Sequence, residues 1–343
     1  MNVRNMNKKE LTELISENTT TTNKDILKNA LETKIKYYGN NIYARGLIEL
    51  SNICKNNCYY CGIRASNSEL NRYRLSKQEI LSCCKEGYEL GFRTFVLQGG
   101  EDLYYTDIIM CDIINSIKKS FSDCAVTLSI GEKSESTYRA YKLAGADRFL
   151  LRHETANATH YSKLHPEDMT LESRKKCLYT LKNLGYQVGA GFMVGSPYQT
   201  IENLAEDLLF LKELEPHMVG IGPFIPHGKT PFKDFLKGGY QQTLSMLALT
   251  RLMLPKVLLP ATTALATINP QNGRKDAFLA GANVVMPNLS PLKHIKDYSL
   301  YDNKLSTGKE AAQSILALKN DIEKLGFVLD MSRGDNVDFI KKG

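Results

Sequence analysis

The sequence contains no tryptophan, and it lacks any apolar run approaching the roughly 20 residues that a membrane-spanning helix needs. The N-terminal stretch MNVRNMNKKELTELISEN also lacks the apolar core of a secretory signal. We therefore expect a cytoplasmic protein with no membrane partner. Because the cytoplasm keeps thiols reduced, disulfides are not expected, and clustered cysteines point instead to metal or redox chemistry.

A strong excess of one charge is also absent. The 343 residues include 44 Lys and Arg against 37 Asp and Glu, which gives a net charge of +7. The lysines are scattered and often alternate with acidic residues, a pattern typical of a solvated surface. We therefore expect no nucleic-acid partner, whereas an anionic small-molecule substrate is compatible with this charge.

Strand-like and helix-like segments alternate along most of the chain. Residues 1–41 are predicted to form N-terminal helices, and clear helical patterns follow at 76–92, 106–120, 134–144, 171–184 and 201–214. The predicted strands are 42–51, 94–100, 125–131, 148–154, 187–195, 218–224, 258–265 and 283–290. Several helices end in a glycine that the next strand follows at once, as in LAGAD at 143–147, which is typical of helix C-terminal capping.

Eight strands with helical crossovers predict an α/β fold, a (β/α)8 TIM-type barrel with an N-terminal helical extension. We expect one domain over 1–343, with the barrel at 42–290 and a C-terminal segment at 291–343. An open doubly wound sheet is the alternative. In a barrel, functional residues lie in the loops that follow the C-terminal ends of the strands.

Three cysteines directly follow the first predicted strand, in the array C-x3-C-x2-C formed by Cys54, Cys58 and Cys61. A structural zinc site needs four ligands, yet the first histidine in the chain is His153. Thiolates also suit iron–sulfur clusters, and a cubane can leave one iron open to another ligand. An incomplete zinc site and three unrelated buried thiols are the alternatives. The remaining cysteines form no such array: Cys83, Cys84, Cys111, Cys124 and Cys177.

This array, placed after the first strand of a predicted barrel, resembles the radical S-adenosylmethionine (SAM) superfamily. The motif QGGED at 98–102 is similar to the glycine-rich motif of that family. The resemblance implies a [4Fe–4S] cluster on the three cysteines, with SAM bound to the fourth iron. It further implies reductive cleavage of SAM to a 5′-deoxyadenosyl radical, with electrons from a donor such as ferredoxin or flavodoxin. The SAM contacts that it implies are Tyr60, Gly99, Gly100, Glu101 and Met193.

Within the superfamily, several segments resemble the [FeFe]-hydrogenase maturases of the HydE type. They are NRYRLS (71–76), VLQGGEDLYY (96–105), LLRHETAN (150–157), MVGIGPFIPH (218–227), LPATTAL (259–265) and GANVVMPN (281–288). The resemblance implies that Glu154 contacts the SAM ribose and Arg174 its carboxylate. It also implies a substrate cavity lined by Thr127, Arg152, Met218, Thr262, Thr263, Met286, Tyr298 and Tyr301.

The substrate implied by this resemblance is an iron–carbonyl–cyanide–cysteine precursor of the hydrogenase cluster, and other hydrogenase maturases are implied partners. No cysteine follows Cys177. The C-terminal accessory cluster of some family members should therefore be absent.

The positions of the charged residues in RHETAN also predict a role without the resemblance. Arg152 and Glu154 should share one face of the fourth strand, because side chains alternate along a strand, and His153 should point the other way with a structural role. An arginine can bind a carboxylate or another anion through two parallel hydrogen bonds. Two other functions remain open: a lysine mutase similar to methylornithine synthase, which shares NRYRL and GEDLYY, and a non-catalytic iron–sulfur scaffold.

Overall fold

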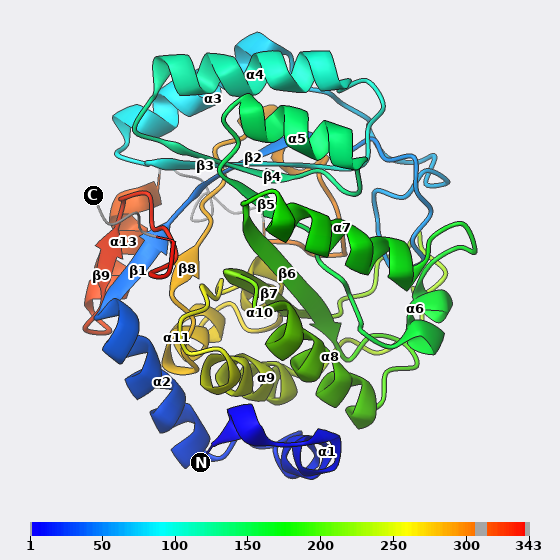
Figure 1. The fold of residues 1–343 in the computed structure, drawn as a ribbon, viewed down its shortest axis with the longest axis vertical. Coiled ribbons are helices and arrows are strands. Elements are labelled where there is room, and N and C mark those ends of the chain that lie inside the picture. The colour runs from blue at the N-terminus through cyan, green and yellow to red at the C-terminus, as the bar shows by residue number, and fades with distance from the viewer. Residues whose placement is uncertain (1, 306–313, 340–343) are drawn as a thin grey trace.

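A ring of parallel strands forms the centre of the computed structural model, which describes residues 2–305 and 314–339. Six strands form one continuous sheet in the order β2-β3-β4-β5-β6-β7 (Figure 1). They span Gly46–Ser51, Thr94–Gly99, Ala125–Ser129, Arg148–Leu150, Gln187–Val194 and Met218–Pro223. Each strand is parallel to its neighbours. Parallel pairing is what the alternation of strands with helices predicts.

Two short segments close this sheet into a ring. Leu258 forms a parallel bridge with Met218 of β7, and Pro260 bridges Val284 of β8 (Val284–Val285). Asn288, just beyond β8, bridges Leu47 of β2. The eight strand positions therefore return to the first one, which confirms the predicted (β/α)8-type barrel.

Four predicted strands differ from the structure, two of them only in length: 148–154 ends at Leu150, and 283–290 is reduced to β8. The run 42–51 is divided at Arg45 into β1 (Asn41–Ala44) and β2, because β1 pairs with β8 and β9 (Val328–Asp330), whereas β2 pairs with β3. The run 258–265 ends early, since Thr262 takes the N-cap position of α10 (Thr263–Ile268). The two threonines that looked like strand formers therefore start a helix instead.

Hydroxyl side chains start the helices that cover the barrel. Ser76, Thr106, Ser134, Thr170 and Thr200 each accept a hydrogen bond from the backbone N–H three residues further on. The helices that follow are α3 (Lys77–Glu89), α4 (Asp107–Ser120), α5 (Glu135–Leu143), α7 (Leu171–Asn183) and α8 (Ile201–Leu214). These five match the helical patterns of the sequence to within a few residues.

The other helices are α1 (Lys8–Glu17), α2 (Lys24–Tyr38), α6 (Ala158–Leu164), α9 (Tyr240–Met253), α11 (Gly273–Leu279), α12 (Leu292–Ile295) and α13 (Ile315–Glu323). The short 3-10 helix η1 (Val3–Asn5) precedes α1. The predicted N-terminal helices are therefore present, with α1 packed against α8 and α2 against α9. Within the described ranges, no helix combines the length and the apolar character needed to cross a membrane.

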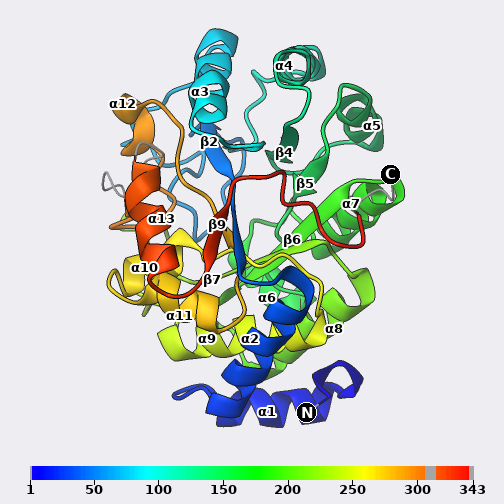
Figure 2. The same cartoon turned by 90° about the vertical axis from the view of Figure 1, so that its left-hand side faces the viewer.

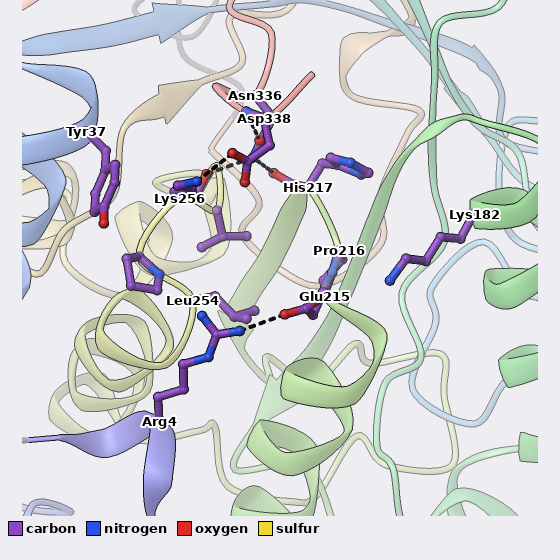
Figure 3. Close-up of a pocket in the computed structure, with 12 residues that line it drawn as sticks. Arg4, Tyr37, Lys182, Glu215, Pro216, His217, Leu254, Lys256, Asn336 and Asp338 are labelled. Atoms are coloured by element: carbon purple, nitrogen blue, oxygen red, sulfur yellow. Dashed lines mark hydrogen bonds and ion pairs between the residues drawn. The ribbon is translucent and has the colours of Figure 1, made fainter. Parts of the chain in front are cut away.

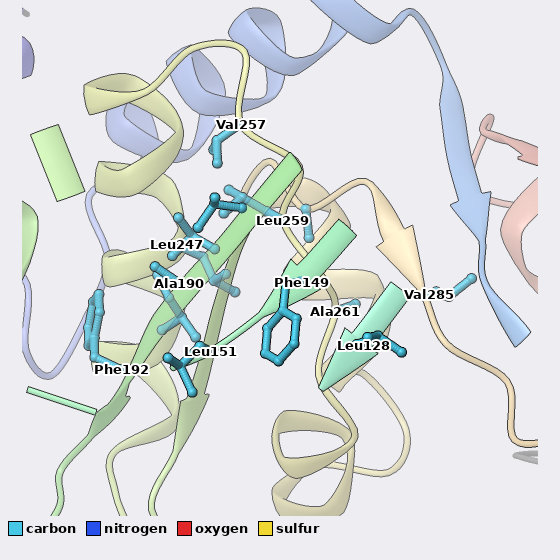
Figure 4. Close-up of a cluster of buried hydrophobic side chains, with 14 of the residues drawn as sticks. Leu128, Phe149, Leu151, Ala190, Phe192, Leu247, Val257, Leu259, Ala261 and Val285 are labelled. Carbon is cyan, nitrogen blue, oxygen red and sulfur yellow. The ribbon is translucent and has the colours of Figure 1, made fainter. Parts of the chain in front are cut away.

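The main core lies between the strands and the outer helices. Val188, Ala190 and Phe192 of β6 belong to one buried cluster with Leu247 of α9 (Figure 4). The side chain of Met193, the next residue along β6, faces the inside of the barrel instead. Because both faces are covered, every residue of β6 is buried, as is usual for a parallel strand. This packing holds the strand ends, and the loops that they carry, in place.

The last part of the described chain, residues 328–339, closes the end of the barrel at which the strands begin (Figure 2). The buried Arg148 donates hydrogen bonds to the carbonyl of Arg333 and to Oδ1 of Asp335, both at 2.6 Å. Arg45, which is 1% exposed, donates to the carbonyl of Gly334. The segment thus provides partners for charged groups that the bottom of the barrel buries.

Candidate active site at the C-terminal end of the barrel

A cavity of about 320 Å³ opens where the barrel strands end. All three cysteines of the array line it, together with many residues that the sequence singled out: Tyr60, Gly99, Gly100, Glu101, Arg152, Glu154, Arg174, Met193, Thr262, Tyr298 and Tyr301. They come from the ends of five different strand positions or the loops after them, from α7 and from the segment beyond β8. The barrel therefore gathers into one space residues that lie far apart in the chain.

Four other predicted residues lie deeper or to one side. Thr127 and Met218 line a second, much smaller cavity inside the barrel, and Leu150 lines both cavities. Thr263 is the first residue of α10, and Met286 packs on the apolar cluster that contains Met218. The structure thus separates these four from the space that the cysteines line.

The QGGED loop packs closely on the cysteine loop. The backbone N–H groups of Asn56 and Glu101 point at Cys54 Sγ, at 3.5 and 3.3 Å. A Cβ at Gly100 would lie 2.3 Å from the carbonyl oxygen of Ile53, so only glycine allows this approach. The second glycine of the motif therefore has a steric reason, and the approach directs two backbone dipoles toward one thiol.

The NRYRLS stretch organises the same loop, a role that the sequence did not indicate. The Arg72 guanidinium donates to the carbonyls of Ile63, Arg64 and Asn67, at 2.7 to 2.9 Å. Arg74 forms a two-pronged ion pair with the carboxylate of Asp102, which follows QGGE. These bonds tie the chain beyond the third cysteine to the loop after β3.

Several buried polar atoms in the cavity have no hydrogen-bond partner among the described residues. They are Nε and Nη2 of Arg152, Oε2 of Glu154, Nε of Arg174 and Oγ1 of Thr262. Arg152 and Glu154 form an ion pair at 3.2 Å, and Arg174 lies 2.7 Å from Glu132, but neither contact has hydrogen-bond alignment. A buried polar group without a partner costs about 1–3 kcal/mol. A polar ligand that supplied the missing bonds would recover that energy.

Glu154 lies in the left-handed backbone region, with φ 65°, at a tight turn in which Thr155 N–H donates to the carbonyl of His153 at 2.9 Å. His153 accepts a hydrogen bond at Nδ1 from Gly191 N–H, so its Nε2–H donates to Asp207 Oδ1 at 3.2 Å. Burial lowers the pKa of His153 well below its usual value. His153 is therefore a neutral residue that points away from the cavity and helps to hold the Glu154 turn in place.

Comparisons with known proteins identify the family. The model of the Radical SAM superfamily matches residues 48–211. The [FeFe] hydrogenase maturase subunit HydE of Thermotoga maritima is 46% identical over 323 residues, which cover 94% of this chain and 92% of that protein. This chain belongs to the radical SAM superfamily. It is a radical SAM enzyme and a homologue of HydE.

Three further proteins are similar to this chain. The 3-methylornithine synthase of Methanosarcina acetivorans is 29% identical over 84% of this chain and 81% of its own length. The crystal structure of methylornithine synthase (PylB) superposes with a TM-score of 0.81 at 25% identity, over 96% of both chains. The maturase HydG from Carboxydothermus hydrogenoformans gives a TM-score of 0.79 over 95% of this chain and 76% of its own. At 22% identity, the likeness to HydG shows the fold alone.

The radical SAM family implies a [4Fe–4S] cluster and SAM, and the cavity has groups that suit both. Burial raises the pKa of all three thiols, that of Cys61 to about 12, so ligating thiolates require a bound cation nearby. Among residues 2–305 and 314–339, no three His, Cys, Asp or Glu side chains converge to hold a single metal ion. A set of three separated thiols fits a larger iron–sulfur cluster better than one zinc ion.

Tyr60 has partners that the sequence did not indicate. Its hydroxyl donates to His165 Nε2 at 3.1 Å, because His165 Nδ1–H already donates to the carbonyl of Tyr161. The His165 ring also stacks on Tyr161, with centroids 3.9 Å apart. Burial lowers the pKa of His165 to about 3, so it remains a neutral acceptor. These contacts fix the position of Tyr60, which lines the cavity.

Proposed function

We propose that this radical SAM enzyme is a HydE-type maturase that acts on an iron–carbonyl–cyanide–cysteine precursor of the [FeFe]-hydrogenase active site. The observation that carries the proposal is the 46% identity to HydE, which extends over nearly the whole of both chains. It is supported by the one cavity that holds the cysteine array together with buried polar atoms of Arg152 and Thr262 that lack partners.

Cys54, Cys58 and Cys61 would hold the [4Fe–4S] cluster, and the N–H groups directed at Cys54 Sγ would stabilise its thiolate. When bound, the cluster supplies the one-electron reduction that breaks a carbon–sulfur bond of SAM. The walls of the cavity would then determine which way SAM lies. Tyr60 and Met193 offer an aromatic and an apolar surface for the adenine.

The charged residues divide the polar contacts to SAM between them. The Glu154 carboxylate, with Oε2 unbonded, can accept hydrogen bonds from the ribose hydroxyls. The Arg174 guanidinium is suited to the SAM carboxylate, and Glu101, beside Gly99 and Gly100, to its ammonium group. Binding at several points fixes orientation, which is the main contribution that a protein makes to cofactor chemistry.

The substrate would occupy the side of the cavity formed by Arg152, Thr262, Tyr298 and Tyr301. An anionic cyanide-bearing complex suits the Arg152 guanidinium and the unbonded Thr262 hydroxyl. Tyr298 is 2% exposed and Glu154 is 9% exposed, so water has little access once ligands fill the space. The deeper candidates Thr127, Met218, Thr263 and Met286 would contact the substrate only if it extends down the barrel.

Anaerobic reconstitution with iron and sulfide, followed by SAM and dithionite, tests the proposal. We expect 5′-deoxyadenosine, and faster formation when an iron–dicarbonyl–cyanide–cysteine complex is added. Lysine in a parallel reaction tests the mutase alternative, which the likeness to methylornithine synthase favours. Conversion of lysine without any effect of the iron complex would overturn the maturase proposal. A protein with intact cluster that neither binds nor cleaves SAM would be a scaffold.

A further inference from the structure

A ridge of apolar side chains lies exposed beside the loops that carry the site. We define it as Tyr198, Phe235 and Leu236, which are 53%, 37% and 90% exposed. Tyr198 follows β6, whereas Phe235 and Leu236 follow β7, and the Tyr198 and Phe235 rings lie 5.4 Å apart. Single exposed apolar residues are ordinary, but neighbouring ones mark contact surfaces. Tyr198 also has a φ of 65°, a costly backbone conformation for a residue other than glycine.

The ridge is continuous with the cysteine loop. The Phe235 ring contacts that of Phe232 at 5.3 Å, and Phe232 contacts Tyr59 at 6.1 Å, both edge to face. Tyr59 directly follows Cys58 in the chain. Phe232 also packs in a buried cluster with Met193, which lines the site cavity. A protein bound on the ridge would therefore be separated from the cysteine loop by a few packed rings.

Lysines surround the ridge. The Lys163 ammonium lies 5.2 Å from the centre of the Tyr198 ring, and Lys233 and Lys237 are exposed on either side of Phe235 in the chain. The exposed acidic residues near the ridge in the chain are Asp234, between these two lysines, and Glu202, four residues after Tyr198, so three lysines exceed them by one positive charge. An apolar, aromatic centre with a charged rim is the usual anatomy of a protein–protein interface.

We propose that this ridge is the docking surface of a small acidic one-electron carrier protein of the flavodoxin or ferredoxin type. The proposal rests on the proposed function, because reductive cleavage of SAM consumes electrons one at a time. One electron passes from the reduced carrier to the site and is consumed in breaking one carbon–sulfur bond of SAM. The carrier leaves oxidised by one electron.

The charge of the surface selects this occupant over a second copy of the chain. The chain itself carries a net charge of +7, so two copies would repel each other across the lysines, whereas an acidic carrier would be attracted. The ridge is also small, which suits the limited interfaces of transient electron-transfer complexes. Complementary charge of this kind mainly raises the association rate and falls off with added salt.

The test measures binding of oxidised flavodoxin to the protein, both cluster-free and reconstituted, at low and high salt. We expect Lys233→Glu/Lys237→Glu to raise the Kd at low salt about 10-fold, and Leu236→Glu to raise it at both salt concentrations. The control is Lys24→Glu/Lys119→Glu, which makes the same change in net charge on exposed lysines of α2 and α4. Its Kd should stay within about 2-fold of the wild-type value.

A second measurement separates docking from chemistry. With dithionite as reductant, both ridge variants should form 5′-deoxyadenosine at the wild-type rate, whereas with reduced flavodoxin they should be about 10-fold slower at low carrier concentration. Unchanged binding in the ridge variants, or an equal loss in the control, would overturn the docking proposal. So would a wild-type dimer that Leu236→Glu dissociates. Failure of the wild type to cleave SAM with dithionite would overturn the proposed function. In that case, the Kd values for oxidised flavodoxin would still show whether the carrier binds at the ridge.

Discussion

The two ends of the barrel both contain a cavity, but their chemistry is opposite. The cleft at the bottom is the larger, about 430 Å³ against about 320 Å³ at the top (Figure 3). Its charged side chains have partners, since Arg4 pairs with Glu215 at 2.7 Å and Lys256 with Asp338 at 2.6 Å. At the top, Nε and Nη2 of Arg152 have no hydrogen-bond partner among residues 2–305 and 314–339, whereas Arg45 and Arg148 at the bottom leave only Nε without one. The arginine with the larger unmet demand for hydrogen bonds therefore lies at the top, although the cleft at the bottom has the larger volume.

The difference has a cause in how the chain closes each end. At the bottom, Asn336 of the C-terminal segment donates to the carbonyls of His217 and Lys256. Asp335 accepts from the buried Arg148. At the top, the described loops around the strand ends supply no hydrogen-bond partner to Nε and Nη2 of Arg152. Substitution of single side chains at each end tests this contrast.

Cys58→Ala should have the largest effect, because it removes one of the three thiols that would hold the cluster. Reconstituted protein should lose most of its iron, and 5′-deoxyadenosine should fall at least about 100-fold, beyond the 10–100-fold typical of changes around a metal site. Iron analysis and product assay measure this. The matched control is Cys111→Ala on α4, which should keep both its iron content and its 5′-deoxyadenosine formation. A fully active Cys58→Ala protein would contradict the assignment of the site.

Asp335→Ala tests the bottom, where the expected effect is on stability. The substitution leaves the guanidinium of Arg148 buried without its carboxylate partner. We expect the free energy of unfolding to fall by about 2–4 kcal/mol. This is at or below the range for a fully buried pair, because the Asp335 side chain is 20% exposed. Urea unfolding measures it. SAM affinity of the folded fraction should not change. Asp338→Ala, which breaks a more exposed pair with Lys256, should cost below about 1 kcal/mol.

Arg174→Met tests an arginine at the top, where we expect an effect on binding. A hydrogen bond to a charged group contributes about 1.5–3 kcal/mol, so the Kd for SAM should rise about 10-fold to 100-fold. Calorimetry on reconstituted protein measures this, with the exposed neighbour Lys176→Met as the control. If Arg174→Met instead destabilised the fold and left SAM affinity intact, its ion pair with Glu132 would be structural, like those at the bottom.

Arg4→Ala should have the smallest effect. Both members of its pair with Glu215 are about half exposed, and such surface pairs contribute about 0–1 kcal/mol. We expect a small shift in the urea midpoint and no change in SAM affinity. Weaker SAM binding would show that the larger cleft communicates with the site, which would break the contrast between the two ends.

Much of the fold could be predicted from the sequence, because its signals are local. Helix α8 begins and ends where its apolar pattern predicts, and Thr200 caps it. Gly145 and Gly185 have positive φ at helix ends, as capping predicts. The run 258–265 was predicted less well, since β-forming threonines can also start a helix, and only the approach of β7 and β8 ends the strand at that point.

The candidate site also has features that the sequence predicts and features that it does not. The spacing of Cys54, Cys58 and Cys61 and the glycines of QGGED are readable in the chain, because each acts through near neighbours. The contacts that hold these site residues in place could not be predicted from the sequence. Tyr60 depends on His165, more than 100 residues further on, and no local pattern marks that contact.

By itself, the sequence determined the order of strands and helices, the cysteine array at a strand end and the helix caps, because each depends on residues a few positions apart. Only the tertiary structure decided which polar groups are satisfied. Arg148 is bonded to Asp335 and His153 to Asp207, whereas Nε and Nη2 of Arg152 have no hydrogen-bond partner in the part of the chain that the structure describes. The physical reason is that burial makes each polar atom depend on partners from distant segments, and those meet only when the barrel closes.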